Sequence, residues 1–220
     1  MGISIRIRGE KACFRDPSFP GRNTYKIITP WAAKRILEAI YWKPQFQWKI
    51  LSIKVLNPVE IRSHKPQAPE ILEKFTVLRH VDYIINAEVV VDKPDYYSQK
   101  GHKSVVQEDE AAIAGRHLAI FKRRCRQKNF YQTPFLGIRG FCCEVDLVNA
   151  NESSRLQVPE MPQATQDFGI IFHDFIYIPR FDGVSPGYDK IPAYFNALLV
   201  NGTVNTDNVQ TFHSECSLTR

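Results

Sequence analysis

Segments with strand-like and helix-like hydrophobic patterns alternate along this chain in an order that few folds accommodate. Four segments have the alternating or β-branched character of strands, and they span residues 3–7, 46–55, 81–91 and 135–147. Two segments with apolar residues at helical spacing follow the first and the third of these strands. The order predicts an α+β protein with a ferredoxin-like (RRM-like) βαββαβ domain, an arrangement that many RNA-binding modules use.

The first helix has clear boundary signals. Thr29 is placed to cap it, Pro30 to open it and Pro44 to end it. The apolar face of the second helix is expected to carry Ala114, Leu118, Phe121 and Cys125. We also expect a bulge in the second strand near residues 51–52, loops at residues 15–23 and 62–69, and a polar, mobile segment at residues 93–110.

The remainder of the chain predicts a second, smaller unit. Residues 149–166 have little apolar content and are expected to form a linker, so the predicted domains are residues 1–148 and residues 149–220. Strands are expected at residues 170–178 and 194–200, and Asn201-Gly202 is a strong hairpin-turn signal. The second unit is therefore predicted to be a small antiparallel β-sheet domain with a frayed tail at residues 211–220.

Charge and cysteine content limit the class of protein. A formal net charge of +6 and a pI near 9.1 favour a nucleic-acid partner or an anionic membrane surface. We expect no membrane span, because no apolar run approaches the ~20 residues that one requires. Five cysteines without a CxxC pair, and six scattered histidines, predict reduced thiols in a cytoplasmic protein with no metal and no cofactor.

The second helix is strongly basic toward its end. Within seven residues it carries Lys122, Arg123, Arg124, Arg126 and Lys128. One interpretation is a solvated helix face with favourable charge near the helix C-terminus. The other is a phosphate-binding stripe, which predicts RNA binding that weakens steeply with salt.

Tyr41 and His117, with Arg116 and Arg124 on the polar side of the histidine, form a candidate cluster for metal-independent RNA cleavage. At about 100° per residue, Tyr41 and His117 each fall at the edge of an apolar helix face, and the two helices of a split βαβ fold lie side by side. Histidine titrates near neutral pH and can take a proton from a ribose 2′-OH, while arginine stabilises charge on the phosphate. The alternative is that His117 is structural, as most isolated boundary histidines are.

Several segments resemble one protein family. Residues 29–44, TPWAAKRILEAIYWKP, resemble the first-helix signature of the Cas protein five family, subtype I-C (formerly Dvulg). The segments FTVLRHVDYIINAEVVV, GRHLAIFKRRCRQKNFYQTPFLGIRGF and AYFNALLVNGTV fit the same family in the same order.

The resemblance implies an endoribonuclease that cuts the repeat hairpin of precursor CRISPR RNA and then holds the mature 5′ handle inside a Cascade complex. The family's catalytic tyrosine, lysine and histidine correspond to Tyr41, Arg116 and His117. Expected RNA contacts are Lys43, Arg62, Lys122, Arg123, Arg124, Arg126, Lys128 and Arg139. Expected protein partners are the backbone and large subunits of type I-C Cascade.

Four features depart from the family pattern. Arg116 stands in place of the lysine, and it keeps the charge but does not readily transfer a proton. The usual REF reads Arg139-Gly140-Phe141, so a carboxylate is missing, and the Arg-rich motif after the second strand is reduced to residues 61–65. Arg35 replaces a small residue in the first helix.

Four functions remain open from the sequence. The leading hypothesis is the processing endoribonuclease, and the second is a non-catalytic structural subunit that grips the 5′ handle. A generic ferredoxin-like RNA-binding module is the third. Binding of duplex DNA is the fourth, since a basic surface permits it.

Overall fold

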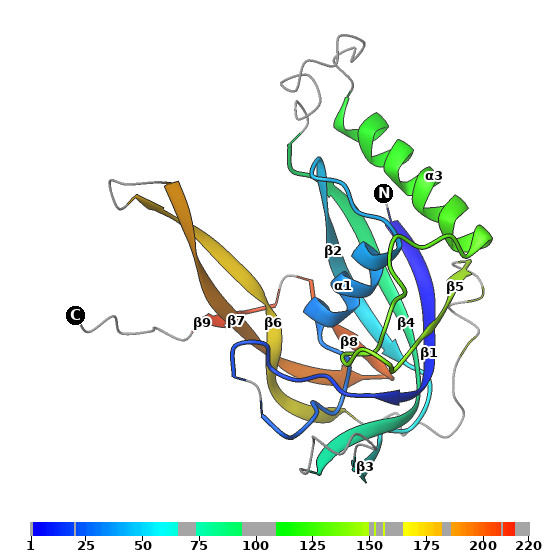
Figure 1. The fold of residues 1–220 in the computed structure, drawn as a ribbon, viewed down its shortest axis with the longest axis vertical. Coiled ribbons are helices and arrows are strands. Elements are labelled where there is room, and N and C mark those ends of the chain that lie inside the picture. Colours follow the sequence, from blue (N-terminus) through cyan, green and yellow to red (C-terminus); the bar gives the residue numbers. More distant parts are fainter. Residues whose placement is uncertain are drawn as a thin grey trace.

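The computed structural model describes residues 2–19, 21–65, 74–93, 109–149, 152, 156, 165–181, 186–207 and 209–213. It has a mixed α/β fold dominated by one antiparallel sheet (Figure 1). The helices are α1 (Pro30–Ile40) and α3 (Glu110–Gln127). The strands are β1 (Gly2–Ala12), β2 (Phe46–Val55), β3 (Glu60–His64), β4 (Phe75–Val91), β5 (Glu144–Val148), β6 (Gln166–Phe181), β7 (Pro186–Val200), β8 (Thr203–Asn205) and β9 (Phe212–His213).

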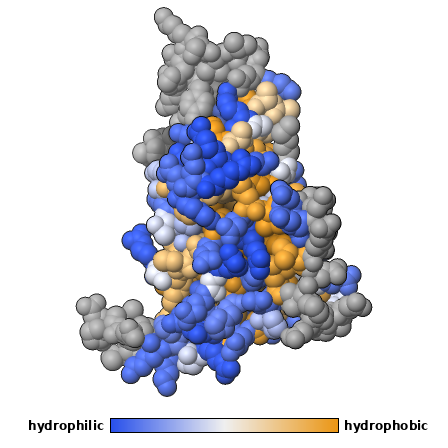
Figure 2. All heavy atoms as spheres, turned by 90° about the vertical axis from the view of Figure 1, so that its right-hand side faces the viewer, coloured by the Kyte–Doolittle hydropathy of each residue, from blue (hydrophilic) through white to orange (hydrophobic). Residues whose placement is uncertain are grey.

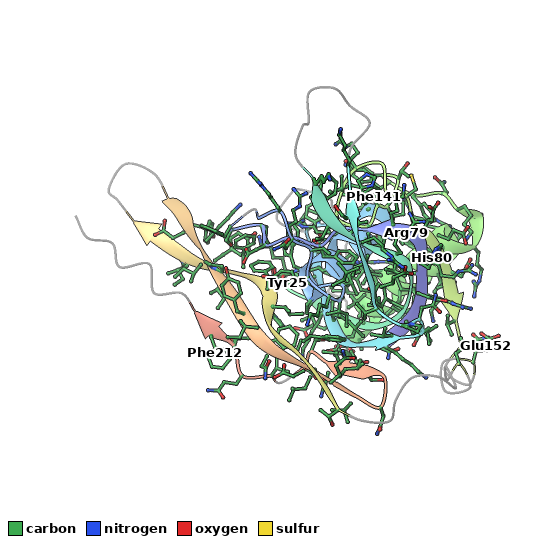
Figure 3. All side chains as sticks on the ribbon, turned by 90° about the horizontal axis from the view of Figure 1, so that it is seen from below. Tyr25, Arg79, His80, Phe141, Glu152 and Phe212 are labelled. Carbon is green, nitrogen blue, oxygen red and sulfur yellow. The ribbon has the colours of Figure 1, made fainter. Side chains whose placement is uncertain are left out.

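The strands form a sheet in the order β5-β1-β4-β2-β8-β7-β6, while β3 pairs with β4 and β9 pairs with β7. The short strand β8 pairs with both β2 and β7, so the C-terminal strands continue the sheet that contains β1 and β4. Beyond this junction β6 and β7 extend as a two-stranded ribbon (Figure 1). Seen from below, Phe212 lies beside this ribbon, whereas Arg79 and His80 lie in the main body (Figure 3).

The core lies between the helices and the sheet because each element buries one face. Ile3, Ile5 and Ile7 of β1 are buried, and the polar residues between them are only partly covered. The helices contribute Ala33, Ile36, Leu37 and Ile40 from α1, and Leu118, Phe121 and Cys125 from α3. No helix within the described residues is long and apolar enough to span a membrane.

Three local predictions are confirmed. The Thr29 hydroxyl accepts a hydrogen bond from the Ala32 amide at 3.2 Å, and Pro30 opens α1. The register of β2 against β4 shifts between Ile50 and Ser52. Asn201 and Gly202 both have positive φ, which a tight turn between two antiparallel strands requires.

The first helix ends earlier than predicted. It ends at Ile40 rather than at Pro44, and Tyr41 has an extended backbone with φ −159° and ψ 126°. The Tyr41 amide still donates to the Leu37 carbonyl at 3.0 Å, and its own carbonyl accepts from the Trp48 indole at 3.3 Å. Leaving the helix at this point turns the tyrosine ring into the core, where it stacks on Phe46.

Two strand predictions were wrong in extent. The expected loop at residues 62–69 begins as β3, an exposed edge strand without the apolar alternation that marks a buried one. Its partner β4 begins at Phe75 instead of Val81. The expected strand at residues 135–147 shrinks to β5, because Gly137 and Gly140 have positive φ and the Leu136 amide donates to the Phe141 carbonyl in a tight loop.

Three predictions fall mainly on residues outside those the structure describes: the mobile segment at residues 93–110, the linker at residues 149–166, and the frayed tail at residues 211–220.

Candidate active site

A tyrosine and a histidine from the two helical regions meet in the core. The Tyr41 hydroxyl lies 2.9 Å from Nδ1 of His117. Tyr41 caps the end of α1, and His117 lies on the buried face of α3. Both side chains are almost fully covered, with 4% and 3% of their surface exposed. Tyr41 and His117 therefore do face one another, although Tyr41 reaches His117 from the residue after the helix and not from the helix itself.

The second ring nitrogen of His117 is held by Gln45. Nε2 lies 2.9 Å from the amide oxygen of Gln45, which is also buried. An amide oxygen only accepts hydrogen bonds, so Nε2 carries the proton and Nδ1 has a free lone pair. Tyr41 therefore donates its hydroxyl proton to Nδ1. The backbone carbonyl of Gln45 accepts hydrogen bonds from the backbone amides of Asp92 and Lys93. These bonds fasten Gln45 to the segment directly after β4.

The surroundings keep the imidazole neutral. The Phe46 ring lies 4.6 Å from the His117 ring and also stacks on Tyr41 at 5.8 Å. Burial, together with the positive charges of Arg116 and Lys43, lowers the pKa of His117 to about 4. At neutral pH the His117 ring is therefore uncharged, with Nδ1 accepting from the Tyr41 hydroxyl and Nε2–H donating to Gln45.

The guanidinium group beside the phenol belongs to Arg124. It lies over the Tyr41 ring, 5.2 Å from the centroid, and its Nη1 donates to the Ile40 carbonyl at 3.4 Å. Arg116 precedes His117 on α3 with an exposed side chain, and its charge acts on the histidine. The structure thus places two arginines near the pair, and Arg124 is the one in contact with Tyr41.

The other expected RNA contacts lie in different surroundings. Lys122 and Arg126 line a groove of about 620 Å³ together with Ser4 and Asn86. Lys128 is the left-handed cap of α3 and bonds Asp146 at 2.7 Å. The basic residues of α3 therefore do not form one stripe, although hydrophilic side chains cover much of this side of the molecule (Figure 2).

The three remaining cations come from other segments. Arg62 is on β3, which lies at the opposite end of the body from α3, and it pairs with Glu60 at 2.7 Å (Figure 1). Lys43 is exposed two residues after Tyr41, and Arg139 is exposed in the loop before β5. Arg123 is exposed on α3.

Sequence reasoning missed Gln45 and Phe46. Gln45 is a polar residue directly before a strand, where the sequence pattern indicates a solvent-exposed side chain. Phe46 fits the alternation of β2, but that alternation indicates only that it is buried. A sequence signal for either contact is lacking, since both depend on where α1 ends.

Comparisons with known proteins place the chain among CRISPR-associated proteins. A family model described as CRISPR-associated protein (Cas_Cas5) matches residues 2–204. A protein of Mannheimia succiniciproducens named CRISPR pre-crRNA endoribonuclease Cas5d is 28% identical, over 97% of this chain and 96% of its own length. A protein of the same name from Thermus thermophilus is 29% identical, over 63% of this chain and 61% of its own.

Two solved structures share the fold. One is a functionally uncharacterized protein, SMU1763c, of Streptococcus mutans, with a TM-score of 0.72 and 24% identity over 93% of this chain and 91% of that one. The other, described as a CRISPR-associated protein, has a TM-score of 0.72 and 22% identity over 99% of this chain and 95% of that one.

Proposed function

Since the chain belongs to the CRISPR-associated Cas5 family, we propose that it is a metal-independent endoribonuclease that cuts precursor CRISPR RNA in the repeat hairpin. The two relatives named above carry that activity in their names. The observation that supports it in this chain is the 2.9 Å bond between the Tyr41 hydroxyl and the lone-pair nitrogen of His117. Gln45 fixes the tautomer that this bond needs.

The pair suits attack by a ribose 2′-OH on the adjacent phosphate. The Tyr41 oxygen accepts the 2′-OH proton while its own proton moves to Nδ1 of His117. A bond forms between the 2′ oxygen and phosphorus, and the bond from phosphorus to the 5′ oxygen breaks. The leaving 5′ oxygen takes up a proton from solvent, and His117 then returns its extra proton to solvent through Tyr41, which restores the starting state. The products are a 2′,3′-cyclic phosphate and a 5′-OH.

The arginines supply the positive charge that this reaction needs. A phosphate that draws the Arg124 guanidinium away from the Tyr41 ring would gain a cation at the reacting group. Arg116, exposed on the same helix, is a second phosphate contact. We assign Lys43, Lys122, Arg123, Arg126 and Arg139 to the RNA hairpin and the retained 5′ handle.

A second function is favoured by the burial of the pair. Tyr41 and His117 are covered in the structure, and Arg116 replaces the family's lysine. Both observations favour a non-catalytic subunit that grips the 5′ handle within type I-C Cascade, beside the backbone and large subunits. This subunit would bind RNA tightly and release no product.

One experiment separates the two functions. The purified chain is incubated with its repeat RNA in EDTA, and the products are analysed for a cyclic phosphate end. We expect cutting by the wild type and no cutting by His117→Ala, with RNA binding retained. His173→Ala, a change at a partly buried histidine on β6, is the control and should cut normally. A repeat that stays intact at every enzyme excess would leave only the structural function.

The order of strands and helices in the first part of the chain also supports a role in RNA binding. Without β3, the strands of the first part have the order β5-β1-β4-β2, with α1 after β1 and α3 after β4. This is the order of a ferredoxin-like domain, and we assign it to residues 1–148. We assign the described strands β6, β7, β8 and β9 to the added antiparallel unit proposed for residues 149–220.

A further inference from the structure

An open groove on the outer side of α1 is lined by aromatic side chains. It has a volume of about 570 Å³, and Trp31, Trp42, Tyr131 and Phe135 form its aromatic lining. We call it the aromatic groove. Trp42 is 49% exposed and Tyr131 is 71% exposed. Exposed aromatic residues gathered in one groove indicate a binding surface, because single exposed apolar residues are ordinary and clusters of them are not.

Backbone hydrogen bonds hold the walls of the groove in place. The segment after α3 is fastened to the end of α1, where the Tyr131 amide donates to the Ile40 carbonyl at 3.3 Å and the Gln132 amide donates to the Ala39 carbonyl at 2.8 Å. These bonds satisfy carbonyl groups that the helix end leaves open. On the helix itself, Arg35 lies 5.3 Å from the Trp31 ring centroid. The Arg35 side chain thus adds a positive charge to the groove and is balanced in part by Glu38 at 2.6 Å.

The groove adjoins the Tyr41–His117 pair. Backbone extension at Tyr41 turns this ring inward and the next side chain, Trp42, outward into the groove. The Ile40 carbonyl accepts both Arg124 from the side of the pair and the Tyr131 amide from the side of the groove. The two sites therefore share one hydrogen-bond acceptor, the Ile40 carbonyl.

The chemistry of the groove distinguishes it from the other exposed apolar surface of the molecule. The ribbon of β6 and β7 exposes more aliphatic than aromatic side chains: Ile170, Ile176, Ile178, Leu198 and Val200 against Tyr177 and Tyr188. The exposed apolar side chains of the groove are aromatic, and the aliphatic Ile36 in its floor is buried. Flat rings beside a cation suit the faces of nucleobases, which stack without regard to sequence.

We propose that the aromatic groove binds unpaired nucleobases of the RNA by stacking on Trp42 and Tyr131. The inference rests on the proposed function, because it makes RNA the occupant. It adds that single-stranded nucleotides next to the cut are held by their bases on one side of Tyr41, while the basic residues hold phosphates.

The probe is a pair of decamers of equal charge. One is a 2′-O-methyl oligoadenylate, which cannot be cut by 2′-OH attack, and the other is an abasic decamer with the same number of phosphates. We expect the wild type to bind the oligoadenylate more tightly. Trp42→Leu and Tyr131→Leu should each weaken oligoadenylate binding by about 5-fold or more and leave abasic binding unchanged. Tyr131→Phe, which keeps the ring, should bind as the wild type does.

Two further measurements sharpen the result. Tyr177→Leu on β6 is the matched control, because Tyr177 is 49% exposed like Trp42, and it should change neither affinity. Tryptophan fluorescence should be quenched by oligoadenylate and not by the abasic decamer, since two of the three tryptophans line the groove and Trp48 is buried.

The proposal is overturned if the groove variants bind oligoadenylate as the wild type does, the outcome expected when the groove binds a protein partner. It is also overturned if they lose affinity for both decamers equally. Cleavage of the repeat in EDTA is scored separately. If the wild type cuts no repeat while the groove variants still lose base-dependent binding, the endoribonuclease proposal is refuted. The proposal that the aromatic groove binds bases then stands.

Discussion

The amide oxygen of Gln45 lies 2.9 Å from Nε2 of His117, and this contact decides which nitrogen of the imidazole faces Tyr41. Because the oxygen can only accept, the proton stays on the Gln45 side. The lone pair is thereby aimed at the Tyr41 hydroxyl. Gln45 is a positioning residue in the proposed reaction and acts through His117.

Exchanging Gln45 for a carboxylate should move the pH dependence of cleavage. In Gln45→Glu the negative charge favours the imidazolium and raises the pKa of His117 from about 4. Cleavage should then fall at pH values where the wild type is fully active and recover as the pH rises. Single-turnover rates from pH 5 to 9 measure this shift. A purely structural role for Gln45 predicts a lower rate with an unchanged profile.

Removing the phenol oxygen should separate chemistry from binding. Tyr41→Phe keeps the stack on Phe46 but leaves Nδ1 of His117 without its donor. We expect the cleavage rate to fall by about 100-fold or more and RNA affinity to stay unchanged. The buried, unpaired nitrogen should cost about 1–3 kcal/mol of stability in urea unfolding. Wild-type cleavage by this variant would remove Tyr41 from the reaction.

Acid should destabilise the protein through His117. Its pKa is lowered to about 4 in the folded state, whereas an unfolded histidine titrates near 6.5. Below pH 6.5 the unfolded chain binds a proton that the folded chain does not, so stability falls between pH 6.5 and 4. The loss is up to about 3 kcal/mol. Urea unfolding at pH 7, 5.5 and 4.5 should show it in the wild type, and His117→Phe should lack this part of the pH dependence.

Phosphate contacts should be revealed by salt. Lys122→Gln and Arg126→Gln each remove one cation from the groove that also contains Ser4 and Asn86. Each should reduce the slope of log affinity against log salt by about 0.7 to 0.9. Arg62→Gln is the comparison, because Arg62 is paired with Glu60 on a strand at the other end of the body. A reduction in slope for Arg62→Gln as large as for the two others would contradict this assignment of surfaces.

Alternation and turn signals were sufficient to predict the central elements from sequence. The isoleucines of β1, the Thr29-Pro30 start of α1, the β2 bulge and the Asn201-Gly202 turn each depend on a few neighbouring residues. The exposed strand β3 was missed because it lacks a buried face, and the glycines at 137 and 140 turn an apparent strand into a loop. The joining of β8 to β2 depends on contacts between residues about 150 positions apart.

The site was predictable in part, because local sequence patterns also place the helices that carry its residues. The side-by-side helices of a split βαβ fold predicted Tyr41 and His117 as partners, and the structure joins them. The position of Arg124 over the phenol and the contact of Gln45 depend on the early end of α1 at Ile40. The sequence pattern favoured a helix as far as Pro44, so neither contact could be derived from it.

Phe46 packs against both the phenol and the imidazole, so one core side chain holds both rings of the reactive pair in place. A smaller side chain, as in Phe46→Leu, costs only packing energy where a core residue fills space. Here the same swap would tilt two functional rings at once. A substitution at Phe46 is therefore expected to change reactivity together with packing, so neither property can be tuned there without the other.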